Sequence, residues 1–275
     1  MMPKTLYISD LDGTLLTSEQ RISERSLEII NRLTDEGMIF SYATARSIVT
    51  ARKVTGGLVV RHPVIVYNGA FIINNDTGER LLKNVYTPNE AEEIYNTLSG
   101  FGISPFVYAV IDDKENFSYV PSRLTRGQKD FNDTRKGDPR HRPVSDDSEM
   151  LMGDIFYFSC IDEAGSMGEA YEALKDQFYC IYGEDIYSGD QWLEILPTSA
   201  TKANAVRQLK EYLDCERLVV LGDGINDISM FKAADECYAV ANADPSLKEI
   251  ADGIIGGNNE DGAAEFLLKH FSKNT

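Results

Sequence analysis

Short apolar runs alternate with amphipathic stretches at the start of the chain. An apolar run at residues 5–9 precedes a stretch over residues 23–36 in which leucine and isoleucine recur at helical spacing, and further apolar runs follow at residues 38–43 and 64–67. Strands that alternate with helices are typical of a parallel sheet covered by helices. The pattern therefore predicts an α/β core.

The same alternation returns after residue 190. Apolar, strand-like runs are expected at residues 192–196, 218–221, 237–241 and 253–255. Helices are expected at residues 202–213, 226–234, 246–251 and 261–271. We therefore assign residues 1–82 and 191–275 to one discontinuous core domain.

The intervening residues do not continue the regular alternation of strands and helices, and their pattern predicts an inserted α+β domain over residues 83–190. Helices are expected at residues 89–98 and 166–175, and strands at residues 105–111, 155–160 and 178–182. Residues 122–149 are rich in charge, Gly and Pro and show no periodicity, which predicts a long loop with one short element at most. The basic residues of this loop either reach an acidic substrate or belong to a solvated connector.

Composition places the chain among ordinary globular proteins. Its 275 residues are 43% hydrophobic and 26% charged, and no apolar run approaches the ~18 residues of a membrane span. The start of the chain has no signal-peptide pattern, so the expected location is the cytoplasm. The formal net charge of −17 argues against nucleic acid as a partner. An anionic substrate remains compatible with this charge if a bound divalent cation reverses the field inside one cleft.

The first candidate for chemistry lies where the first expected strand ends. Asp10 and Asp12 are separated by one residue there, and Gly13 lets the backbone turn tightly. Ligands bind beyond the carboxyl ends of the strands in an open parallel sheet. Asp10 could attack phosphorus while Asp12 handles the proton of the leaving group. The alternative is a polar loop, for which Asp-Gly is a common turn.

Three more polar clusters follow expected strands or begin expected helices. Thr44, Ala45 and Arg46 offer a hydroxyl, backbone N–H groups and a planar guanidinium to phosphoryl oxygens; a capped helix with a solvated arginine is the alternative. Lys202 lies in the first turn of an expected helix, where the helix dipole favours acids, so a phosphate or carboxylate partner would explain it. A surface lysine is the alternative, and it would be favoured if this cluster stood alone.

The last cluster follows the strand expected at residues 218–221. Asp223 and Asp227 lie four residues apart on a strand-to-helix turn, with Asn226 between them. Carboxylate oxygens in this arrangement suit a hard cation such as Mg²⁺. A calcium-type loop or a plain helix cap is the alternative.

In order and in context, these four clusters resemble the four motifs of the haloacid dehalogenase (HAD) superfamily. The insertion resembles the large α/β cap (type IIB) of its Cof-type phosphatases, as do residues 68–70, Asn226 and Asn258. The resemblance implies a Rossmann-like parallel sheet core with an inserted α+β cap. Ala45 and Ala203 replace glycines that are frequent in Cof-type chains and leave the chemical residues in place.

The resemblance also implies roles for individual residues. Asp10 would be the nucleophile and form an aspartyl-phosphate, and Asp12 would be the general acid and base. A magnesium ion would be held by the Asp10 carboxylate, the Asp12 backbone carbonyl and Asp223, with Asp227 supporting them. The residues expected to bind phosphate are Thr44, Ala45, Arg46, Lys202 and Asn226.

The expected activity is Mg²⁺-dependent hydrolysis of phosphate monoesters of small metabolites, either sugar phosphates or phosphorylated cofactors, by a monomer or homodimer. Within the superfamily, an acid at the position of Asp12 goes with phosphatases and phosphomutases, so a phosphomutase is the nearest alternative. A phospho-aspartate receiver combines similar residues, but it is about half as long and has no inserted cap.

Overall fold

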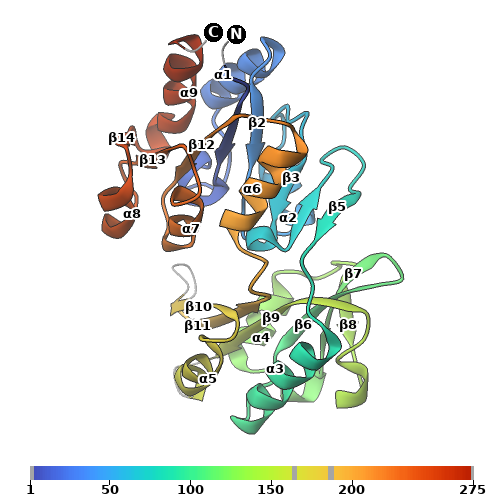
Figure 1. The fold of residues 1–275 in the computed structure, drawn as a ribbon. Coiled ribbons are helices and arrows are strands. Elements are labelled where there is room, and N and C mark those ends of the chain that lie inside the picture. Colours follow the sequence, from blue (N-terminus) through green and yellow to red (C-terminus); the bar gives the residue numbers. More distant parts are fainter. Residues whose placement is uncertain (1–2, 163–165, 185–188, 274–275) are drawn as a thin grey trace. The chain divides into compact units, whose positions relative to one another are not determined.

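The computed structural model describes residues 3–162, 166–184 and 189–273. The chain forms two compact units, which divide after Lys83 and after Ser199 (Figure 1). The first unit contains both ends of the chain, and the second is inserted into it. Among the described residues, no helix combines the length and hydropathy needed to cross a bilayer.

The first unit is built on a fully parallel sheet. Its order is β14-β13-β12-β1-β2, with β1 (Thr5–Ser9) between β12 (Arg217–Gly222) and β2 (Ile39–Tyr42), and β13 (Glu236–Val240) and β14 (Gly253–Ile255) towards one edge. The central strands are apolar and buried on both faces, as expected of a parallel sheet. The prediction of an α/β core with a parallel sheet is confirmed.

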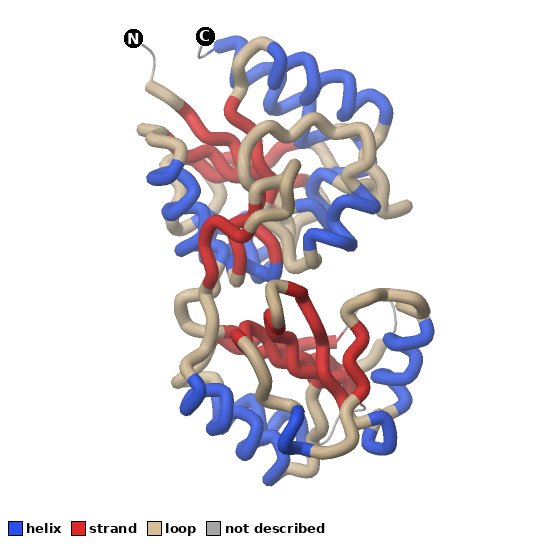
Figure 2. The backbone as a smooth tube through the Cα atoms, turned by 90° about the vertical axis from the view of Figure 1, so that its right-hand side faces the viewer, coloured by secondary structure: helices blue, strands red, loops and turns tan. Residues whose placement is uncertain are grey.

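Helices cover both faces of this sheet, as Figure 2 shows. On one face α1 (Glu24–Asp35) packs against α9 (Gly262–Lys273), and Tyr7 of β1 makes edge contacts with rings of α9. On the other face, Leu6 and Ile8 of β1 share an apolar cluster with residues of α6 (Lys202–Tyr212) and α7 (Ile228–Phe231). The first unit also contains α2 (Ile48–Val54) and α8 (Pro245–Ile250).

A small antiparallel sheet continues the core beyond β2. It contains β3 (Val64–Val66), β4 (Phe71–Ile73) and β5 (Arg80–Lys83), and a parallel bridge from Ala43 to Ile65 joins it to the end of β2. The turn between β3 and β4 is unusual, because two consecutive residues with side chains, Tyr67 and Asn68, have φ values of 50° and 52°.

The second unit has a six-stranded sheet of order β10-β11-β9-β6-β7-β8, antiparallel except for the β7–β8 pair. The strands are β6 (Phe106–Ile111), β7 (Lys114–Tyr119), β8 (His141–Pro143), β9 (Asp154–Asp162), β10 (Tyr179–Glu184) and β11 (Gln191–Leu196). The helices α3 (Pro88–Gly100) and α5 (Ser166–Leu174) share one apolar cluster with this sheet.

The assignment of residues 191–199 to the core is wrong at this boundary. β11 pairs antiparallel with both β9 and β10, so it lies inside the inserted sheet. An apolar run of six residues fits either sheet, and its own sequence does not identify the strands with which it pairs.

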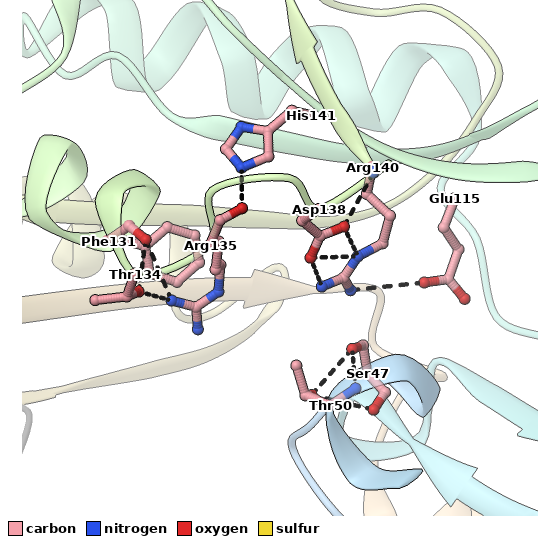
Figure 3. Close-up of polar contacts among 9 residues, drawn as sticks. All are labelled: Ser47, Thr50, Glu115, Phe131, Thr134, Arg135, Asp138, Arg140 and His141. Carbon is pink, nitrogen blue, oxygen red and sulfur yellow. Dashed lines mark hydrogen bonds and ion pairs between the residues drawn. The ribbon is translucent and has the colours of Figure 1, made fainter. Parts of the chain in front are cut away.

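Residues 122–149 are also more structured than the long loop expected from their composition. They contain α4 (Arg126–Asp133) and β8, and a capping box at Thr125 and Gln128 begins the helix. Figure 3 shows the guanidinium of Arg140 against the carboxylate of Asp138, with three hydrogen bonds of 2.6–3.2 Å, and Glu115 at 3.8 Å. Local capping and paired charges stabilise this segment despite its lack of apolar periodicity.

Candidate active site

Asp10 lies immediately beyond the carboxyl end of β1. Its backbone N–H donates to the carbonyl of Leu221 at 2.9 Å, which continues the pairing with β12 by one residue. The chain then turns at Gly13, whose φ is 75°. A side chain at Gly13 would collide with the carboxylate of Asp223. Only glycine therefore permits this close approach between the turn after β1 and the turn after β12.

Lys202 connects two of the acidic residues. Its Nζ donates to Oδ1 of Asp10 at 2.5 Å and to Oδ1 of Asp227 at 2.7 Å, and the lysine side chain is fully buried. Burial alone would lower the pKa of Lys202, but the two carboxylates outweigh it and raise the pKa above its usual range. The anionic partners that the sequence led us to expect for this lysine include these two carboxylates.

Asp227 is a fully buried residue whose two oxygens have different partners. Oδ1 accepts from Lys202, and Oδ2 accepts from the backbone N–H groups of Asp223 and Gly224, both at 3.0 Å. The carboxylate therefore fixes the turn after β12. These hydrogen bonds fit the supporting role that was expected for Asp227 beside a metal ion.

Asp10, Asp223 and Asp227 form a cluster in which one ligand atom from each lies within 4.8 Å of the others. Burial raises the pKa of Asp10, and the negative charges of Asp227 and Asp223 raise it further, against the opposing effect of Lys202. Burial also raises the pKa of Asp223 to about 6, although Thr14 donates to its Oδ1 at 2.7 Å. Three acids thus face one lysine, and their oxygen donors suit a hard divalent cation.

Asp12 and Arg46 form a separate pair beside this cluster. Nε and Nη2 of Arg46 donate to Oδ2 and Oδ1 of Asp12 at 2.7 and 2.5 Å, so the guanidinium uses the fork that was expected to meet phosphate. Thr44 is buried, and its Oγ1 accepts from the backbone N–H of Arg46 at 3.1 Å. Asp12, Thr44, Ala45 and Arg46 all belong to the same unit as Asp10.

Asn226 extends the site towards the turn between β3 and β4. Its Nδ2 lies 3.4 Å from Oδ1 of the buried Asn68, whose backbone N–H donates to the carbonyl of Thr44 at 2.9 Å. The sequence identified Asn68 only as a Cof-type feature, without a role. The signal for its backbone was present, because asparagine tolerates the left-handed conformation better than most residues.

Two further side chains at the site were given no role from the sequence, although Thr14 belongs to the first of the four motifs. Thr14 binds Asp223, and Asn242 donates from Nδ2 to the carbonyl of Gly13 at 2.8 Å. Asn258, a Cof-type feature of the sequence, donates to the carbonyl of Leu16 at 2.9 Å. The contact of Thr14 could have been suspected from its place one residue after Gly13, whereas Asn242 has no local signal, since its partner lies far away in the sequence.

An acidic cluster at the carboxyl edge of a parallel sheet, with a buried lysine and an inserted second domain, defines a class of phosphate-transferring α/β enzymes. Residues 7–267 match the model of the haloacid dehalogenase-like hydrolase family, and the chain belongs to this family. It is a phosphatase of the Cof-type branch, an enzyme that hydrolyses phosphoric monoesters.

Individual relatives are similar over their whole length. The chain is 29% identical to the 5-amino-6-(5-phospho-D-ribitylamino)uracil phosphatase YwtE of Bacillus subtilis, covering 94% of this chain and 95% of that protein. It is 25% identical to YitU of the same organism, which has the same enzyme name, with 97% of each covered. A crystal structure of a haloacid dehalogenase-like hydrolase from Bacteroides thetaiotaomicron matches 98% of this chain and 100% of its own, with a TM-score of 0.79 and 25% identity.

Proposed function

We propose that this phosphatase is Mg²⁺-dependent and hydrolyses phosphate monoesters of small metabolites through an aspartyl-phosphate on Asp10. The observation that carries the proposal is the position of Asp10, at the carboxyl end of β1 with Lys202 Nζ at 2.5 Å and two further acids close by. Lys202 holds the carboxylate in place and offsets the negative charge that gathers when a phosphate approaches.

The proposed reaction has two steps. An oxygen of Asp10 forms a bond to phosphorus while the bond to the ester oxygen breaks, and Asp12 gives its proton to the departing alcohol. Asp12 then takes a proton from water, and the water oxygen attacks the aspartyl-phosphate to release inorganic phosphate and restore Asp10. In both steps the phosphoryl oxygens contact the hydroxyl of Thr44, the backbone N–H of Ala45, the ammonium of Lys202 and the amide of Asn226.

The donor set of the site fits a magnesium ion. The Asp10 carboxylate, the Asp12 backbone carbonyl and Asp223 would hold the ion, and Asp227 would orient this set through the amides of Asp223 and Gly224. When bound, Mg²⁺ would neutralise charge on the transferring phosphoryl group. Support comes from the unbalanced charge of three clustered acids against one lysine and from the raised pKa values of Asp10 and Asp223.

The names of two relatives support a proposal for the substrate class. YwtE and YitU are named as phosphatases of a phosphorylated ribitylamino compound, which is a small metabolite with a sugar-alcohol phosphate. We propose sugar phosphates or phosphorylated cofactors and their precursors as the class that this chain hydrolyses.

Hydrolysis of p-nitrophenyl phosphate tests the proposal. We expect turnover with Mg²⁺, none with EDTA, and a loss of at least about 10³-fold in Asp10→Asn, because the nucleophile and a metal ligand are removed together. Asp35→Asn is the matched control, since Asp35 pairs with Arg61 on the surface. Full activity of Asp10→Asn, or equal rates with Mg²⁺ and EDTA, would contradict the proposed mechanism.

A further inference from the structure

The pair of Arg46 and Asp12 uses both oxygens of the proposed acid and base. Arg46 donates from Nε to one carboxylate oxygen of Asp12 and from Nη2 to the other, at 2.7 and 2.5 Å. A two-point contact between a guanidinium and a carboxylate fixes the rotation of the carboxylate as well as its position. The side chains are 20% and 39% exposed, respectively, so the contribution of the pair to stability is small, on the order of 1 kcal/mol or less.

Arg46 is itself held by several segments of the core unit. Its backbone N–H donates to Oγ1 of Thr44 at 3.1 Å, and its carbonyl accepts from the backbone N–H of Tyr67 at 3.0 Å. Its Nη2 also donates to Oε1 of Gln20 at 3.1 Å. Tyr67 and Gln20 both have left-handed backbones, with φ values of 50° and 55°. Such conformations carry a free-energy cost, and they persist where the surrounding structure requires them.

In the proposed reaction, one oxygen of Asp12 must contact the ester oxygen that departs. From the two-point contact we infer that Arg46 is a positioning residue for Asp12. Arg46 stays hydrogen-bonded to one carboxylate oxygen of Asp12 while the other oxygen contacts the leaving group. This inference rests on the proposed function of the same site. As the bond from phosphorus to the ester oxygen breaks, the proton of Asp12 passes to that oxygen, and the carboxylate left behind regains both hydrogen bonds to Arg46.

This role differs measurably from the phosphate-binding role that the sequence suggested for Arg46. A residue that binds the phosphoryl group acts on every monoester alike, because that group is common to all of them. A residue that positions the proton donor acts most on esters whose leaving group needs the proton. The ratio of kcat/KM for two aryl esters that differ in how much their leaving groups need a proton therefore separates the two roles.

The test compares p-nitrophenyl phosphate with phenyl phosphate in the full-length enzyme with Mg²⁺. Phenol has a pKa of about 10, like the tyrosine side chain, and needs a proton far more than p-nitrophenol does. We expect Arg46→Met to raise the ratio of kcat/KM for the nitrophenyl ester to that for the phenyl ester about tenfold. Arg46→Lys should not restore the ratio, because an ammonium cannot make the two-point contact.

Three variants make the result specific. Gln20→Ala removes one support of Arg46 and should shift the ratio in the same direction by a smaller factor. Arg25→Met removes an arginine ion-paired with Glu265 and should leave the ratio unchanged. In an Asp12→Asn background, Arg46→Met should not change the ratio further, since the residue through which it acts is gone.

The outcomes are distinct. An equal fall of kcat/KM for both esters in Arg46→Met would assign Arg46 to phosphate binding and overturn the inference. A further rise of the ratio in the Asp12→Asn background would overturn it too. Inactivity of the wild type towards both esters would overturn the proposed function and this inference together.

Discussion

Lys202 is the residue on which the charge balance of the site depends. It is the common partner of Asp10 and Asp227, and all three side chains are buried. A buried lysine and a buried carboxylate are each costly in free energy when alone, and acceptable together because they pair and share hydrogen bonds.

Replacement of Lys202 tests this dependence. Lys202→Met should lower the free energy of unfolding by about 3–5 kcal/mol at neutral pH, because it leaves two buried acids without their cation. Lys210→Met is the matched control; Lys210 pairs with Asp235 on the surface, and its loss should cost less than about 1 kcal/mol. Urea denaturation of both variants measures the difference. Equal stability of the two variants would mean that the buried pairs contribute no more than a surface pair.

At the residue scale, the sequence predicted which side chains lie together better than it predicted their hydrogen-bond partners. Asp10, Asp223 and Lys202 were expected at one site because they follow apolar strands or begin a helix, and parallel strands bring such positions to one edge of the sheet, where the structure places them. The two-point contact of Arg46 with Asp12 was not foreseen, because the residues lie 34 positions apart and an arginine fork suits phosphate as well as carboxylate.

At the element scale, the strands of the parallel core were predicted closely, and so were three strands of the inserted sheet, β6, β9 and β10. Core strands alternate with helices, so each short apolar run between two amphipathic stretches predicts one strand. β11 was assigned to the wrong sheet, and no strand was predicted at β4, β5, β7 or β8. Antiparallel pairing depends on contacts across the chain, which a short apolar run does not specify. The capping box of α4 can be recognised in the sequence. The segment was nevertheless predicted as a loop, because it is rich in charge and lacks apolar periodicity.

The turn between β3 and β4 shows why these missed elements matter. Gly69, with a φ of 107°, lies so close to the carbonyl of Thr201 that an added Cβ would be 2.5 Å from its oxygen. Thr201 is the N-cap of α6, and the next residue is Lys202. The position of the turn therefore determines where the helix that carries Lys202 begins.

Gly69→Ala should therefore reduce both stability and activity. We expect a loss of about 2–4 kcal/mol in the free energy of unfolding, from the left-handed backbone and from the displaced start of α6. Gly37→Ala is a matched control in the same unit, since Gly37 has a φ of 101° and open space around its Cβ position. Its cost should be limited to the backbone, about 1 kcal/mol. Chemical denaturation and p-nitrophenyl phosphate turnover of both variants measure the difference. Equal losses of stability and activity in the two variants would mean that the contact with Thr201 is unimportant.

At the scale of the whole molecule, the net charge of −17 and the acidic cluster both predict that added cations stabilise the folded state. Any added salt screens the repulsion among surface acids and stabilises the fold a little. A divalent ion bound at a specific site stabilises the folded state more, by an amount that depends on the concentration of the free ion relative to its dissociation constant. Comparison at equal ionic strength separates the two effects.

The pH dependence gives this site its sharpest test. Asp10 and Asp223 have pKa values raised in the folded protein, that of Asp223 to about 6, so without metal the folded state binds more protons than the unfolded state. Their contribution to stability is then complete at low pH; that of Asp223 is lost as pH rises through about 6, and that of Asp10 is lost as pH rises through its own raised pKa. In the proposed site Mg²⁺ would replace the protons on these acids, and we expect it to raise the unfolding temperature by several degrees at pH 7.5 and by clearly less at pH 5.0. Thermal unfolding with MgCl₂ or with NaCl of the same ionic strength measures this, and Asp223→Asn should remove most of the gain at pH 7.5. A cation held by the clustered acids competes with their protons in that range, and Asp223 is one of its proposed ligands. An equal gain at both pH values, or a full gain in Asp223→Asn, would therefore place the stabilising cation elsewhere.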